Sequence, residues 1–434
     1  MRRHLCDEKP TTYHSHGYSA HGSCAMPVRH AVPFRVVCIV ALLMLGSFPQ
    51  PATGYNGATA KNSDPGEDFK YYSRLFLSCL DNCLVKGCAH VTHKDVDFTT
   101  GGCVPLCALD GSKLEPGEYP PEFTLPMRWT GWDCASDCKY RCTRTVVNVR
   151  QHEGLNTAKY YGKWSFERIL GVQEFISMAA SVANAAVHVW LLPELFRAAF
   201  GMRDANKNKN KNVNRGWAFL WFTNGVTQTH GWFWSAVFHT RDTPWTHLMD
   251  YGSANLIFFV GVFCAVVRVF EVKQKRKIFI LFVLFLATNV AHLLHVNRSQ
   301  TDGTKYHFKF NMRVMIGMAV VHWVLMLRWA FGGLGKQRGK SKGSEGDDSV
   351  AKNSKRKTHL HPGRFYLAKC CFFWHVCALW EVLDFPPVYG VLDAHALWHC
   401  GTPPTVWLWY QFIRTDVGLL EEPEKEKRAE NKIN

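Results

Sequence analysis

The sequence predicts an all-α membrane protein, a bundle of seven transmembrane helices preceded by a disulfide-rich domain. Three observations support this prediction. The apolar residues of the 434-residue chain gather in blocks after about residue 170. Eight cysteines crowd one segment before that point. Lysines and arginines fall in short clusters between the apolar blocks, which is typical of the cytosolic loops of membrane proteins.

The first 54 residues predict a secretory signal peptide with a long N-terminal extension. An apolar run from Val36 to Leu45 follows Arg35, and Ala52 and Gly54 are small residues suited to cleavage before Tyr55. An uncleaved membrane anchor is the alternative interpretation.

Residues 55–170 predict a cysteine-rich lumenal domain. Its cysteines are mostly separated by three residues, whereas zinc ribbons repeat a separation of two. Because the signal predicts export to an oxidising compartment, we expect disulfides, although their pairing cannot be read from the sequence. The eight cysteines are Cys79, Cys83, Cys88, Cys103, Cys107, Cys134, Cys138 and Cys142.

Residues 171–414 contain seven apolar segments, each near the length of about 20 residues that a helix needs to cross a bilayer. The second and sixth also carry polar side chains, which in a membrane normally face the interior of a helix bundle. The segments are Val172–Phe196, Gly216–Phe238, Asp250–Arg268, Lys277–His295, Met312–Ala330, Arg364–Asp384 and Val391–Ile413.

The formal net charge of +16 raises the possibility of a nucleic-acid partner. The basic residues are divided among three loops, however, namely residues 197–215, 273–277 and 331–363. We therefore predict that these loops are cytosolic and that no nucleic acid is bound. The tail, residues 415–434, is cytosolic in the same scheme. The nearly neutral Thr240–Met249 and Phe385–Gly390 loops and the cysteine-rich domain then face the lumen.

Histidine spacing indicates a site at the lumenal helix ends. His395 and His399 lie four residues apart and so share one helix face, and Ser235 and His239 have the same spacing. Asp250 opens the third predicted helix. The predicted topology brings all three helix ends to one side of the membrane.

These residue types suit a zinc hydrolase. Three histidine ligands (His239, His395 and His399) leave a fourth zinc position for water, as in catalytic sites. Asp250 could act as general base, and Ser235 could donate to a developing oxyanion. A hydrogen-bonded pair of interior histidines, a packing role for Ser235 and ligation by His247 remain as alternatives.

Four strings resemble a known family. They are YGKWSF at 161–166, WFWSAVFHTRDT at 232–243, MDY at 249–251 and LDFPPVYGVLDAHALWH at 383–399. Together they resemble the GPI-remodelling phospholipases called post-GPI attachment to proteins factor 3, over Asp68 to the end of the chain. That family belongs to a superfamily with alkaline ceramidases and progestin/adiponectin-type receptors. Its shared motif matches Ser235, His239, Asp250, His395 and His399.

The resemblance implies a GPI-specific phospholipase A2-type ester hydrolase with a zinc cofactor. Such an enzyme removes the sn-2 acyl chain from the anchors of GPI-anchored proteins. The resemblance also implies that it resides in the Golgi or endoplasmic reticulum membrane. Glu174 and Asn184 also match recurring family positions, and their role, like that of Glu381, stays open. A ceramidase-like amidase and a non-enzymatic receptor or escort for GPI-anchored proteins are the alternative functions.

Overall fold

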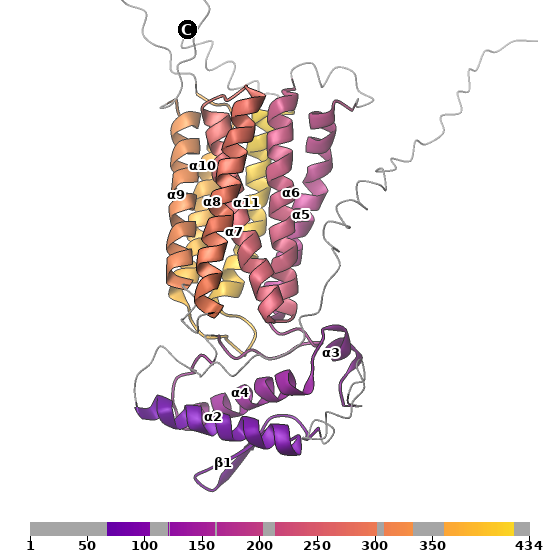
Figure 1. Ribbon diagram of the computed structural model, residues 1–434, viewed down its shortest axis with the longest axis vertical. Helices are drawn as coiled ribbons and strands as arrows, with labels where there is room; N and C mark the ends of the chain where they lie inside the picture. The colour runs from indigo at the N-terminus through magenta and orange to yellow at the C-terminus, as the bar shows by residue number, and fades with distance from the viewer. Residues whose placement is uncertain are drawn as a thin grey trace, which may run out of the picture. The chain divides into compact units, whose positions relative to one another are not determined.

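A computed structural model describes residues 67–104, 120, 122–160, 163–202, 213–301, 308–332 and 360–420. The predicted signal peptide, Cys107, most of the basic linker and most of the tail lie outside these residues. The chain there forms a disulfide-bonded region followed by a bundle of long helices (Figure 1).

Two antiparallel helices, α2 (Glu67–Lys86) and α4 (Cys134–His152), form the centre of the disulfide-bonded region. Cysteines four residues apart on each helix meet in two disulfides, Cys79–Cys142 and Cys83–Cys138. A third disulfide joins Cys88 to Cys103, and Cys134 is disulfide-bonded as well. The expected disulfides are therefore confirmed in the described part of the region.

The disulfide-bonded region also contains a β-hairpin, so the prediction of an all-α protein was wrong in this detail. Strands β1 (His90–His93) and β2 (Val96–Thr99) pair antiparallel, with His93 opposite Val96. The two linking residues, Lys94 and Asp95, both have positive φ, as a tight hairpin turn requires. Four-residue strands give too short a pattern to recognise in a sequence.

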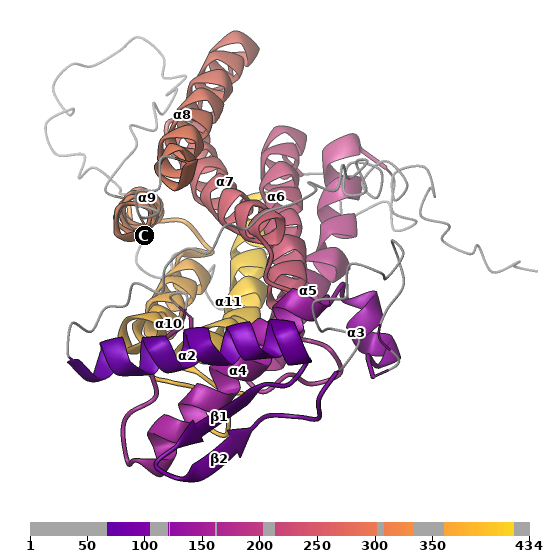
Figure 2. The ribbon, with the colours of Figure 1, turned by 60° about the horizontal axis from the view of Figure 1, so that its bottom comes forward.

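The long helices of the described part of the bundle lie side by side in Figure 1. α8 packs against α7 at the edge of the bundle, as Figure 2 shows, whereas α11 lies between α5 and α10. The helices are α5 (Phe175–Phe200), α6 (Arg215–Thr240), α7 (Pro244–Val269), α8 (Lys275–Thr301), α9 (Phe308–Ala330), α10 (Arg364–Leu383) and α11 (Ala394–Asp416).

Four of these helices, α5, α7, α8 and α9, are long and apolar enough to cross a membrane. The protein is therefore a multi-pass membrane protein. The predicted count of seven crossings is not confirmed by this criterion, which the described residues of α6, α10 and α11 do not meet. Their polar residues include side chains buried in the bundle, such as Asn224 in α6 and His399 and Gln411 in α11.

Helix caps explain where two predicted boundaries differ from the structure. α7 begins at Pro244 rather than Asp250, because Thr243 caps it and exchanges hydrogen bonds with Thr246. α11 begins at Ala394 rather than Val391, because the Asp393 carboxylate accepts from the backbone N–H of Ala396. The expected loop before Asp250 is therefore short, and Asp250 lies two turns inside α7.

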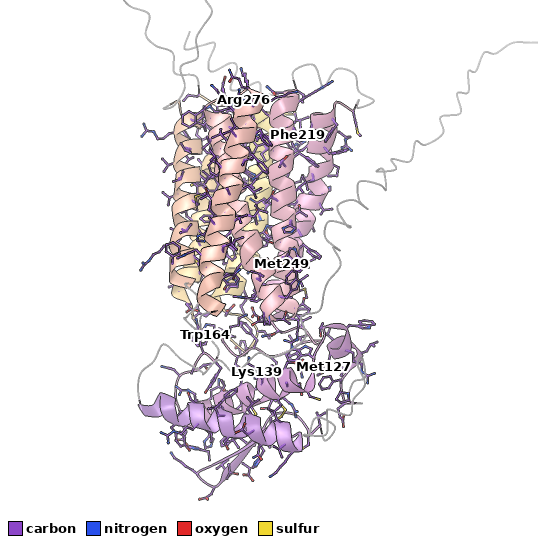
Figure 3. All side chains as sticks on the ribbon, in the orientation of Figure 1. Met127, Lys139, Trp164, Phe219, Met249 and Arg276 are labelled. Atoms are coloured by element: carbon purple, nitrogen blue, oxygen red, sulfur yellow. A yellow bond between two sulfur atoms is a disulfide. The ribbon has the colours of Figure 1, made fainter. Side chains whose placement is uncertain are left out.

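A buried carboxylate holds one end of the bundle together. Asp416, at the end of α11, accepts hydrogen bonds from Arg268 of α7, at 2.7–3.1 Å, and from the indole of Trp221 of α6, at 2.8 Å. His361, just before α10, lies 3.1 Å from the same carboxylate. Figure 3 labels Phe219 and Arg276 near this end and Met249 near the opposite end, where the predicted site lies.

Candidate metal centre

Three imidazole rings meet at the end of the bundle opposite Asp416. His239 comes from the last turn of α6, and His395 and His399 come from the first turns of α11. The Nε2 atom of His399 lies 3.2 Å from that of His239 and 2.9 Å from that of His395. One ligand atom from each ring falls within 4.8 Å of the others, so this group could bind a metal ion.

The opposite nitrogen of each ring has its own hydrogen-bond partner. Nδ1 of His239 lies 2.7 Å from the carboxylate of Glu174, and Nδ1 of His395 lies 2.6 Å from that of Glu381. Nδ1 of His399 lies 3.2 Å from the Ser181 hydroxyl. Glu174 immediately precedes α5, Ser181 lies in α5, and Glu381 is in the last turn of α10.

These partners determine which nitrogen carries the proton. Ionised carboxylates only accept, so Glu174 and Glu381 place the ring protons of two histidines on Nδ1. The Ser181 hydroxyl donates to the carbonyl of Ser177, at 2.8 Å, and so accepts from His399 Nδ1. Neutral rings in this arrangement direct their Nε2 lone pairs at one another, which is repulsive unless a metal ion or an added proton lies between them.

The donor set fits zinc. Two imidazole nitrogens bound tetrahedrally at about 2.0–2.1 Å are separated by about 3.3 Å. The separations of 3.2 Å and 2.9 Å between the Nε2 atoms are close to that value. Histidines bound to metals typically donate their other N–H to a carboxylate or another oxygen, as all three do here.

Asp250 lies near two of the three histidines. It interacts electrostatically with His239 and His395. Among the described residues, it takes part in no hydrogen bond or ion pair with any of the three rings. His247, the rival ligand, is not part of the metal-binding group, and its ring contacts Phe238 and Tyr251. The structure thus separates a histidine group from a nearby carboxylate.

Ser235 lies behind His399 rather than beside its Nε2 atom. Its hydroxyl is 3.1 Å from that of Ser181, which in turn contacts His399 Nδ1. Because the Ser181 proton points to Ser177, Ser235 is the donor in this pair. Asn184 also supports α11, since its amide donates to the backbone carbonyl of His399 at 3.1 Å. The sequence did not indicate either contact.

A connector, residues 159–174, joins the helix ends that carry the histidines. At α6, the backbone N–H groups of Gln173 and Glu174 donate to the carbonyls of Thr240 and His239, at 3.0 and 2.9 Å. At the other side, the N–H of Glu167 donates to the carbonyl of Gly390, five residues before His395, at 2.7 Å.

The connector also holds the end of α10 through Asp384. Its carboxylate accepts from the indole of Trp164, at 3.1 Å, and from Lys159. Asp384 caps α10 in a left-handed conformation with φ +41°. Because Glu381 lies less than one turn earlier, these contacts help to position the carboxylate that holds His395.

Comparison with known proteins places the chain in a family. The model of the Per1-like family matches residues 124–417, which include all three histidines. The chain belongs to the Per1-like family. The resemblance indicated by the sequence motifs is thereby confirmed. No solved structure matches the chain.

Relatives of this Per1-like chain include two proteins named GPI-specific phospholipase A2-like PGAP3. That of Xenopus tropicalis is 30% identical over 323 residues, covering 72% of this chain and 87% of the relative. That of Homo sapiens is 29% identical over 303 residues, covering 69% and 81%. The Protein PER1 homolog of Schizosaccharomyces pombe is 26% identical over 317 residues, covering 72% and 83%.

The contact between Glu381 and His395 predicts an effect on metal affinity. Loss of a carboxylate that orients a histidine ligand typically weakens metal binding about 10–100-fold. We expect Glu381→Ala to do so while the helices stay folded, as measured by competition with a zinc chelator on purified protein.

Glu194→Ala provides the matched control, because Glu194 of α5 pairs with Arg414. Equal zinc affinity in the two variants would contradict the role assigned to Glu381.

Proposed function

We propose that the chain is a zinc-dependent membrane lipid hydrolase that removes the sn-2 acyl chain from GPI anchors of proteins. The observation that carries this proposal is the convergence of three anchored imidazoles at one point. The Per1-like relatives named GPI-specific phospholipase A2-like support the choice of substrate. The described residues supply both a candidate metal group and a nearby carboxylate.

His239, His395 and His399 would hold the metal through Nε2. The chemistry that zinc supplies at such a site is polarisation of a carbonyl group and activation of water. Glu174, Glu381 and Ser181 keep the ring protons on Nδ1, so the three lone pairs stay directed at the same point. The protein thereby fixes the geometry of the centre before substrate arrives.

Asp250 is proposed as the general base. It is close enough to His239 and His395 for electrostatic interaction, yet makes no ion pair with either ring. Its carboxylate can therefore accept the proton of the attacking water without being a metal ligand. A positioned base of this kind typically contributes about 10²–10⁴-fold to the rate.

Ser235 could act as an oxyanion donor or as a support for His399, and the two roles predict different effects of Ser235→Ala. As an oxyanion donor, it must turn its proton from Ser181 toward the substrate. As a support for His399, it keeps donating to Ser181. In the first role Ser235→Ala lowers turnover and leaves zinc affinity unchanged, whereas in the second it lowers both.

The proposed topology has seven crossings, with the cysteine-rich region and the metal centre on the lumenal side of the Golgi or endoplasmic reticulum membrane. The basic linker, residues 331–363, is then cytosolic, in agreement with the charge pattern of membrane loops. The connector ties the cysteine-rich region to the helix ends that carry the histidines. Both therefore lie on the same side of the membrane, which is where the lipid of a GPI anchor is exposed.

Substitutions distinguish the roles of the metal ligands and the base. We expect His239→Ala, His395→Ala and His399→Ala each to lose bound zinc and lipid release. Asp250→Asn keeps the shape of the side chain but removes its basicity, so zinc should stay while turnover falls about 10²–10⁴-fold. Zinc content and release of fatty acid from a GPI substrate measure the two effects.

His375→Ala is the control, because His375 is an exposed histidine outside the centre. Loss of zinc in Asp250→Asn would make the aspartate a ligand. Release of a ceramide-derived fatty acid but no GPI-derived one would favour the amidase. Normal zinc with no release from either substrate would favour a receptor or escort.

The topology predicts which segments a protease reaches in sealed microsomes. We expect cleavage in the basic linker, residues 331–363, from the cytosolic side and protection of the cysteine-rich region. Detergent, which opens the vesicles, should abolish that protection. A protected linker with an accessible cysteine-rich region would reverse the orientation and place the centre at the cytosolic leaflet.

A further inference from the structure

The short helix α3 (Leu125–Trp129) exposes its apolar side chains on one face. Leu125 and Trp129 are four residues apart and so lie on the same side of the helix, with 56% and 78% of their surfaces exposed. Met127, which points elsewhere, is buried at 8% exposure with Phe123 and Trp132. Figure 3 labels Met127 in this part of the molecule. Large apolar side chains gathered on one exposed face are suited to an interaction surface.

α3 is fastened to the turn that leads into α5. The hydroxyl of Thr130 and the indole N–H of Trp132 both donate to the carbonyl of Gly171, at 3.1 and 2.7 Å. Gly171 has φ +75°, and a Cβ atom there would come within 2.8 Å of the Pro126 backbone. Glycine is therefore required for the turn to pack this closely on α3.

The turn also presents an exposed leucine beside α3. Leu170 precedes Gly171, has a positive φ of 51° and is 70% exposed. We call Leu125, Trp129 and Leu170 the α3 patch. Gly171 lies four residues before Phe175, where the membrane-spanning helix α5 begins. The patch is therefore close to the level at which the chain enters the bilayer.

We propose that the α3 patch binds lipid, inserting into the interfacial layer of the leaflet that α5 enters at Phe175. Tryptophan favours this layer, because its ring combines an apolar body with a polar N–H group. Gly171, which accepts hydrogen bonds from Thr130 and Trp132, lies four residues before α5, and this position beside a membrane-spanning helix favours lipid over a separate protein partner. The inference does not depend on the proposed hydrolase activity.

Binding of lipid by the patch has a consequence for the metal centre. Gly171, which holds α3, lies in the connector three residues before Glu174, the partner of His239. Insertion of α3 into the interfacial layer of the membrane would therefore fix the distance of the connector from the membrane. The cysteine-rich region would rest on the membrane beside the helix ends that carry the histidines.

Photo-crosslinking in lipid nanodiscs tests this inference on the full chain. A photoreactive phenylalanine analogue replaces Trp129 in one sample and Val96 in another. Val96 is the matched control, because it is an exposed apolar residue of the same region, on β2, with 40% of its surface accessible. Mass spectrometry of the cleaved chain identifies what each position has captured, and non-reducing electrophoresis checks that the disulfides have formed.

We expect phospholipid adducts at position 129 at a level several-fold above that at position 96. Lipid capture that is equal at the two positions, or lower at 129, would overturn the inference. So would capture at 129 of a second copy of the chain instead of phospholipid, since the patch would then be a protein interface. None of these outcomes depends on zinc or on lipid release.

Discussion

The arrangement of the candidate site depends on a single constraint, that three imidazole lone pairs point at the same place. Nε2 atoms 2.9 and 3.2 Å apart repel one another unless a metal ion or an added proton lies between them. The Nδ1 atom of each ring is hydrogen-bonded to Glu174, Glu381 or Ser181, so the ring cannot turn away without losing that hydrogen bond. The fold therefore maintains an arrangement that a bound metal ion makes favourable.

This constraint explains why the ends of several helices must be fixed relative to one another. His239 and His399 are 160 positions apart, and the partners of the three rings come from the start of α5, from α5 itself and from α10. The connector links these ends through backbone bonds at Thr240 and Gly390. Buried pairing of Asp416 with Arg268 fixes the opposite end of the bundle. The cysteine-rich region thus contributes to the site through the connector.

Much of this arrangement could be predicted from local patterns. His395 and His399 are four residues apart, so they lie on one face of any helix. The alternation of apolar segments with basic loops predicted where the long helices lie along the chain. The carboxylate of Glu381 was visible in the sequence as a polar residue in an apolar segment, but its partner was not. Ser181 gave no signal, because its contact with His399 spans 218 positions. Such contacts arise from packing between helices, which no local pattern encodes.

X-ray absorption at the zinc edge of the purified, active protein tests the central claim most directly. The account predicts bound zinc with nitrogen and oxygen neighbours at about 2.0–2.1 Å and the scattering pattern of three imidazoles. Loss of the zinc signal in His399→Ala, with the signal retained in the control His375→Ala, would assign the ligand. Zinc bound through sulfur at about 2.3 Å, or fully active protein without zinc, would contradict the account.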